Sequence, residues 1–188
     1  MRILSSLFMT IILFAACSKN KGMEIPEMIY TDFNNRKIAF GGHAVADLDK
    51  SGNNDILFFT MPVGDPLLNR DYHRYHVQGA IHNFFPVKDE EAPVLAKGMT
   101  ISKNSFAGYE WYNVTSLLLA QKVITMQSTY WEGAWHKQSH KYLPLRLLRE
   151  QHEYYGWIEI SFDTTSEKII LHKTGISKEP NREVIAGL

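Results

Sequence analysis

The sequence predicts an all-β fold, either a single β-sandwich or a partly closed barrel of about eight short strands. From about Arg36 onward, short apolar runs alternate with clusters of turn residues, which is typical of β-strands joined by short connections. Helical periodicity of the apolar residues is rare over the same region. The 188 residues are enough for one domain with its own core, and the single cysteine excludes stabilisation by an internal disulfide.

The first candidate strands lie on either side of a polar stretch. Residues 36–49 approach it and residues 54–64 leave it, and both segments are rich in β-branched and aromatic side chains. Residues 72–87 continue the pattern. Residues 92–102 contain the turn-forming pair Lys97-Gly98, so we expect a strand on each side of that turn.

The clearest strands come late in the chain, at residues 141–150, 153–163 and 168–176, each bounded by polar residues, glycine or proline. In the middle one, Trp157, Ile158, Ile160 and Phe162 give the alternation of a half-buried strand.

Two segments are harder to assign. Residues 111–124 could form a short helix from Ser116 to Gln121, with Thr115 or Ser116 as its N-cap, although Val123 and Ile124 favour a strand. Residues 125–140 contain many aromatic and turn residues, which indicates a long loop or a hairpin.

The N-terminus has the pattern of an export signal over residues 1–16. Arg2 supplies a positive charge, an apolar run follows, and Ala15 and Ala16 are small residues before a cleavage point. Directly after them stands Cys17, the chain's only cysteine, and this arrangement resembles the lipobox of bacterial lipoproteins. A buried free thiol is the alternative reading of Cys17.

The lipobox resemblance implies that the thiol of Cys17 carries acyl chains such as palmitate and anchors the protein to a membrane of the bacterial cell envelope. By similarity to enterobacterial sorting rules, Ser18 implies the outer membrane. We expect residues 17–35 to form the lipidated cysteine and a polar tether, and residues 36–188 to form the β domain.

The polar stretch between the first strands has the spacing of a Ca²⁺ loop, with oxygen-bearing side chains at alternate positions and Gly52 at the sixth, where a sharp turn is needed. The candidate ligands are Asp47, Asp49, Ser51, Asn53 (through its carbonyl) and Asp55. The alternative is a polar turn without an ion, in which the Asp and Asn side chains accept hydrogen bonds from nearby backbone.

The twelfth position of this loop is Phe58 rather than the glutamate of an EF-hand, and a strand follows instead of a helix. The stretch therefore resembles the D-x-D-x-[DS]-G-x-x-D loops that connect β-strands in FG-GAP-like repeats and related exported bacterial proteins. That resemblance implies a structural rather than a catalytic role for the ion.

Three later segments extend a resemblance to a loosely defined set of exported bacterial proteins that also have such an aspartate loop. They are residues 142–147, the "YGWI" at 155–158 and the "IAG" at 185–187. The resemblance implies a β fold and export, and no established activity comes with it.

Several functional classes lack support. Lys plus Arg and Asp plus Glu number 20 each, so no basic surface for nucleic acid is expected. There is no G-x-S-x-G motif for a nucleophilic serine, and Lys137 follows His136 where a zinc protease has glutamate. The close pairs His73 with His76 and His136 with His140 are better explained as solvated or structural, and no catalytic residue is predicted.

The aromatic residues include both core and surface candidates. Trp111 and Trp157 are expected in the core. Tyr130, Trp131 and Trp135 lie in a segment with glycine and polar residues, where exposed rings could stack on a carbohydrate or another envelope component. The sequence thus favours a non-enzymatic, lipid-anchored binding or surface protein, and the alternative is a hydrolase acting on envelope or extracellular glycans.

Overall fold

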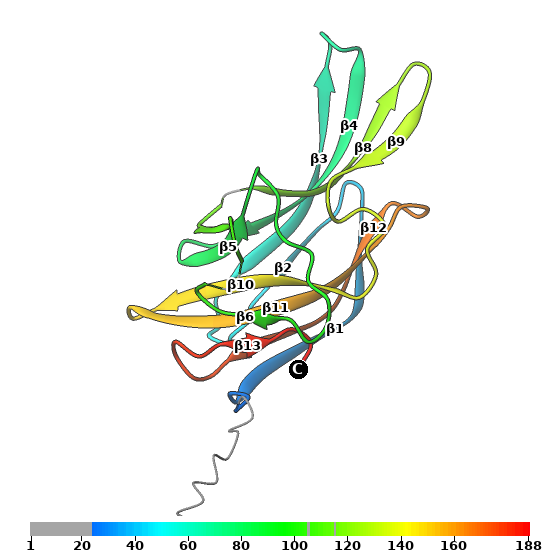
Figure 1. Ribbon diagram of the computed structural model, residues 1–188. Helices are drawn as coiled ribbons and strands as arrows, with labels where there is room; N and C mark the ends of the chain where they lie inside the picture. The colour runs from blue at the N-terminus through cyan, green and yellow to red at the C-terminus, as the bar shows by residue number, and fades with distance from the viewer. Residues whose placement is uncertain (1–23, 105, 115) are drawn as a thin grey trace, which may run out of the picture.

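The computed structural model describes residues 24–188 apart from residues 105 and 115, and every regular element within them is a β-strand. The strands form two large antiparallel sheets and one short pair (Figure 1). This confirms the predicted all-β fold, and its architecture is a β-sandwich. No helix of the described residues is long and apolar enough to cross a membrane.

The larger sheet has six strands. Their spatial order is β1 (Met28–Ala39), β12 (Lys168–Ser177), β11 (His152–Asp163), β10 (Lys141–Arg149), β5 (Asn83–Val87) and β7 (Glu110–Tyr112). The three late strands predicted from sequence therefore form its centre.

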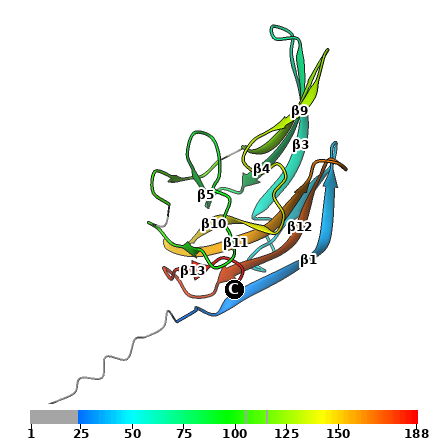
Figure 2. The same ribbon diagram turned by 45° about the vertical axis from the view of Figure 1, so that its right-hand side comes forward.

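The second sheet has five strands. Their order is β2 (His43–Ala46), β3 (Ile56–Asp65), β4 (Arg70–Gly79), β8 (Leu117–Thr125) and β9 (Thr129–Glu132). The hairpins β3–β4 and β8–β9 continue past the sandwich and project from one end of it (Figures 1 and 2). A third, two-stranded sheet pairs β6 (Thr100–Ile101) with β13 (Val184–Ile185).

The main core lies between the two large sheets. Phe58 and Val77 of the five-stranded sheet and Leu145 and Ile160 of the six-stranded sheet belong to one buried cluster. A second cluster covers the opposite face of β10 and β11, where Tyr142 and Trp157 pack with Ile101 and Val184 of the short pair. The central strands are thus buried on both faces, and Trp157 is a core residue as predicted.

Some expected boundaries were wrong. The domain begins earlier than residue 36, because β1 starts at Met28 and pairs with β12 from Met28 opposite Ser177. Residues 28–35 are therefore sheet rather than tether. Cys17 and the rest of residues 1–23 lie outside the described residues.

The segment that could have been a short helix is strand β8. Its residues pair with both β4 and β9, so it lies inside the five-stranded sheet. The β-branched residues Val123 and Ile124 fit this position, and the buried Leu117, Leu119 and Ala120 face the core. Pairing on both edges outweighs the weak local preference for a helix.

Candidate cation loop and polar cavity

The aspartate loop connects β2 to β3, as the sequence predicted. Ala46 and Ile56 are paired across its base, and the amide N–H of Asp55 donates to the carbonyl of Ala46 at 2.8 Å. The nine residues 47–55 therefore leave and re-enter adjacent strands, so the loop closes on itself. Gly52 has a φ of +89°, the left-handed conformation for which glycine was expected at this position.

The three aspartates of the loop converge. One carboxylate oxygen from each of Asp47, Asp49 and Asp55 lies within 4.8 Å of the others. Asp47 accepts the amide N–H groups of Ser51 at 3.1 Å and Gly52 at 2.7 Å, which curls the loop back over its first residue. A set of three carboxylates at this separation has the donor chemistry of a hard cation such as Ca²⁺.

The two other predicted ligands are at the rim. Ser51 and Asn53 are exposed, and Ser51 Oγ accepts the amide N–H of Asn53 at 3.4 Å. The amide N–H of Ser51 also donates to Asp49 at 3.0 Å. These contacts are those of the polar turn that was the alternative reading, and the turn and the carboxylate cluster coexist in one loop.

Asp55 is the buried member of the cluster, with 2 % of its surface exposed. Its carboxylate accepts the amide N–H of Leu48 at 2.7 Å and Nδ2 of Asn83 at 3.2 Å. Asn83 Nδ2 also donates to the backbone carbonyl of Asp55 at 2.6 Å. The loop is thereby fixed to β5 of the opposite sheet.

The sequence analysis did not identify Arg149, which ends β10 and reaches the same cluster. Its Nε donates to Asp49 at 3.1 Å, its Nη2 donates to Asp55, and its Nη1 donates to Asn83 Oδ1 at 3.1 Å. The guanidinium therefore supplies a positive charge to two of the three aspartates. No local pattern could have revealed it, because it lies 94 residues from Asp55.

The pKa values of the two paired aspartates move in opposite directions. Burial raises the pKa of Asp55, and the nearby charge of Asp49 adds to this, against the opposing hydrogen bonds and the charge of Arg149. Burial also works to raise the pKa of Asp49, but hydrogen bonds from Ser51 and the charge of Arg149 leave it below the usual value. The negative charge on Asp49 therefore lies close to the buried carboxylate of Asp55 and disfavours its ionised form.

A cavity of about 320 Å³ adjoins the loop. It is lined by loop residues Asn53, Asn54 and Asp55, by His82 of the β4–β5 connection, and by Arg149. The aspartate cluster is therefore reachable from this side.

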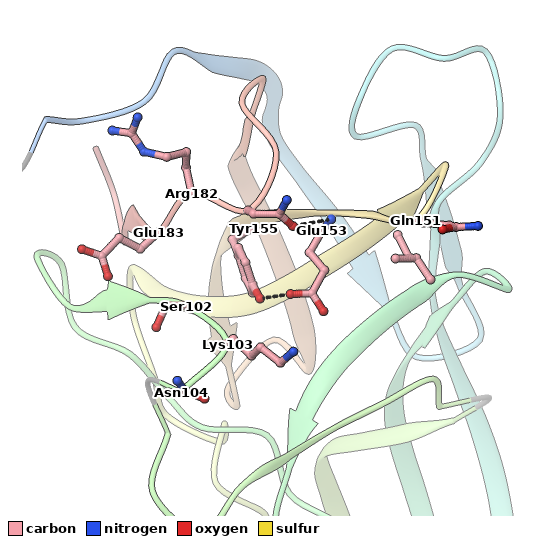
Figure 3. A pocket seen from close by; sticks show the side chains of 10 residues that line it. Ser102, Lys103, Asn104, Gln151, Glu153, Tyr155, Arg182 and Glu183 are labelled. Atoms are coloured by element: carbon pink, nitrogen blue, oxygen red, sulfur yellow. Dashed lines mark hydrogen bonds between the residues drawn. The ribbon is translucent and has the colours of Figure 1, made fainter.

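A second, larger cavity of about 650 Å³ lies where the β10–β11 turn meets the segments that flank β6 and β13 (Figure 3). Its lining includes the polar side chains of Lys103, Asn104, Gln151, Asn181 and Glu183. Amide, ammonium and carboxylate groups around one hollow can hydrogen-bond a small polar molecule.

Glu153 is the best-fixed group of this cavity. Its Oε1 accepts from Arg146 Nη1 at 2.8 Å and its Oε2 accepts from the hydroxyl of Tyr155 (Figure 3). Burial raises the pKa of Tyr155, and the hydrogen bond to Glu153 raises it further, so the phenol stays a donor. Arg146 is itself held over the rings of Phe84 and Trp111, at 4.4 and 5.3 Å from their centroids.

The three aromatic residues predicted as a surface for carbohydrate are not presented together. Trp135 is 1 % exposed and belongs to the main core, so its expected exposure was wrong. The physical reason is that its amide N–H donates to the carbonyl of Leu119 in β8, which holds the segment flat against the sheet. Trp131 packs on Tyr75.

Only Tyr130 of the three is markedly exposed, at 37 %.

The histidines occupy separate environments. His73 stacks on Phe40 and His76 on Phe59. His140 instead stacks on His172, with ring centroids 4.2 Å apart, and its Nδ1 contacts Glu159 at 2.7 Å. These histidine rings therefore contribute to packing on the sheet faces where they lie.

Ser161, His172 and Asn35 form a chain of hydrogen bonds that the sequence did not suggest. His172 Nε2 lies 2.7 Å from Ser161 Oγ, and its Nδ1 lies 2.6 Å from Asn35 Oδ1. Ser161 Oγ also accepts the amide N–H of His140 at 2.9 Å, and Ser161 is buried. The arrangement ties β1, β11 and β12 together at the bulges of β1 and β12.

No protein-family model, curated protein or solved structure matches this chain in comparisons with known proteins.

Proposed function

We propose that this protein is a lipid-anchored component of the bacterial cell envelope that binds a small polar ligand, of carbohydrate type, without chemically transforming it. The observation that supports binding is the cavity of about 650 Å³, which amide and charged residues line. Sugar hydroxyls both donate and accept hydrogen bonds, and this lining offers both kinds of partner.

The state of Glu153 favours binding over the alternative of a glycan hydrolase. A glycosidase needs a carboxyl group that carries a proton to the leaving group. Both oxygens of Glu153 already accept hydrogen bonds, from Arg146 and Tyr155. A general acid at this position would have to give up those donors.

Isothermal titration calorimetry with soluble envelope glycan fragments tests this proposal. Binding that is weakened at least tenfold by Gln151→Ala or Asn181→Ala, with the glycan recovered intact, is the expected result. Gln127→Ala, at an exposed turn remote from the cavity, is the matched control. Release of shortened glycan would establish the hydrolase instead, and unchanged binding by both cavity variants would reject this cavity as the site.

The anchor is proposed from the lipobox at Cys17 and places the protein on a membrane, with the outer membrane as the expected one. Cys17→Ser should abolish incorporation of labelled fatty acid and move the protein from the membrane fraction to the soluble fraction. Unchanged labelling of this variant would contradict the proposal.

The aspartate loop is proposed to bind Ca²⁺ as a structural ion. The three converging carboxylates support this, and the competing guanidinium of Arg149 pairs with Asp49 and Asp55, which leaves Asp47 to the ion. Calcium that binds only the native state stabilises it by about 2.7 kcal/mol at a hundred times its Kd.

Melting temperatures measured with and without millimolar CaCl₂ test the loop. We expect a rise for the wild-type domain, none for Asp47→Ala, and an unaltered rise for the exposed control Asp89→Ala. Arg149→Gln removes the internal cation and should enlarge the response to calcium. If neither the wild type nor Arg149→Gln responds, the aspartate loop is a polar turn that does not bind calcium.

A further inference from the structure

Two hairpins expose large apolar side chains at their tips. Leu67 and Leu68, in the β3–β4 turn, are 92 % and 57 % exposed, and Met126, in the β8–β9 turn, is 89 % exposed. Strands β4 and β8 are paired up to Arg70 opposite Thr125, so the two turns are neighbours. We refer to Leu67, Leu68 and Met126 as the apolar tips, and the two hairpins that carry them project beyond the sandwich (Figures 1 and 2).

The backbone at both tips is already hydrogen-bonded within its own hairpin. Asp65 Oδ1 accepts the amide N–H groups of Leu67 at 3.1 Å and Leu68 at 3.0 Å. Thr125 Oγ1 accepts the amide N–H of Ser128 at 2.9 Å. A turn is costly to place in a medium without water mainly because backbone N–H and C=O groups lose their hydrogen-bond partners. These hydrogen bonds reduce that cost at the two tips.

Behind the tips the hairpins become amphipathic. Tyr130, in β9, is 37 % exposed, and Arg70 begins β4. Aromatic rings with a polar end and arginine side chains are the residues that prefer the headgroup layer of a membrane. The order from apex to sandwich is therefore apolar, then amphipathic, then the buried core.

The size and shape of the apolar tips favour a bilayer over a protein partner. Each partner in a stable protein interface buries about 800 Å², which three side chains on a convex end cannot supply. A bilayer surrounds a projecting tip on all sides and needs no complementary surface.

The charges next to the tips balance. Asp65 and Asp71 stand beside Arg70 and Arg74, so there is no excess charge to attract anionic lipid. Apolar contact would therefore drive the association, and zwitterionic lipid is the appropriate probe.

We propose that the apolar tips insert into the interfacial region of a phospholipid bilayer and give this protein a membrane contact of its own. The contact does not depend on Cys17. It lies at the end of the molecule opposite the start of β1 at Met28 (Figure 1), so it is separate from any attachment through the N-terminus.

The experiment uses residues 24–188, which contain all the described strands and both buried clusters and exclude the lipobox. Flotation with phosphatidylcholine vesicles measures the fraction bound as lipid concentration rises. We expect the triple variant Leu67→Ser, Leu68→Ser, Met126→Ser to bind at least tenfold more weakly, and binding to be equal in 0.1 and 0.5 M NaCl, salt concentrations at which screening differs.

Ile81→Ser is the matched control, because Ile81 is an exposed apolar residue (76 %) away from the tips, and it should bind like the wild type. Unchanged melting temperatures of all variants would show that folding is intact. The proposal is overturned if the wild type does not float with vesicles, or if the triple variant floats equally well. It is also overturned if the tips instead mediate self-association, detected by sedimentation velocity without lipid and lost in the triple variant.

Discussion

His76 should make the stability of this protein strongly dependent on pH between neutral and mildly acidic conditions. The residue lies in β4 with 6 % of its surface exposed, its ring stacks on Phe59, and its Nδ1 lies 2.8 Å from Ser116 Oγ. Its Nε2 is buried without a hydrogen-bond partner. Burial, with a smaller contribution from the positive charge of Arg74, lowers the pKa of His76 to about 4.

The direction in which the free energy of unfolding changes with pH follows from the protonation equilibria of His76 in the unfolded and native states. In the unfolded chain the imidazole binds a proton at a pKa of about 6.5, whereas in the native protein it does so only near pH 4. Between these values the unfolded state carries more protons, so the free energy of unfolding falls as the pH falls. From pH 8 to pH 5, this one group lowers the free energy of unfolding by about 2 kcal/mol.

Urea denaturation followed by tryptophan fluorescence at pH 8 and pH 5 measures this loss. In His76→Phe, which keeps a ring against Phe59, the loss between the two pH values should be smaller than in the wild type by about 2 kcal/mol. His152→Phe, at an exposed position, should keep the wild-type pH dependence. An identical loss in wild type and His76→Phe would refute the reasoning.

The remaining predictions concern packing and the polar cavity. Trp135→Ala removes a fully buried ring and should lower the free energy of unfolding by about 3 to 5 kcal/mol in urea denaturation. Gly156→Ala should lower it by about 2 kcal/mol, because the new Cβ would lie 2.3 Å from Ile176 Cδ1 and 2.5 Å from the backbone oxygen of Gly175, and the crystal structure of the variant should show both the side chain and the β12 backbone displaced. Tyr155→Phe removes the hydrogen bond to Glu153 and should lower the melting temperature by a few degrees.

The late strands show how much of the fold can be predicted from the local sequence. Apolar runs bounded by polar residues, glycine or proline identified β10, β11 and β12, and alternation of apolar and polar residues supported β11. The turn at Gly52 was equally readable, since few residues other than glycine adopt its left-handed conformation without strain.

Prediction from the local sequence failed where pairing with a distant strand determines whether a segment is a strand. Residues 28–35 were assigned to the tether, yet they belong to β1, and residues 28–32 pair with β12. Most of the segment from 116 to 121 became strand because it pairs with β4, and β9 joins the pairing from Gln121 onward. In each case hydrogen bonds from a distant strand outweigh a weak intrinsic preference.

The candidate sites also have features that the local sequence predicts and features that depend on the tertiary structure. The sequence by itself determined that Asp47, Asp49 and Asp55 share one short loop, because their spacing is local. Only the tertiary structure decided that Arg149 enters that loop, that Trp135 is buried, and that Glu153 is fixed in a cavity between three segments. Those results depend on which strands become neighbours, and a strand's neighbours are set by the packing of the whole sandwich rather than by its own residues.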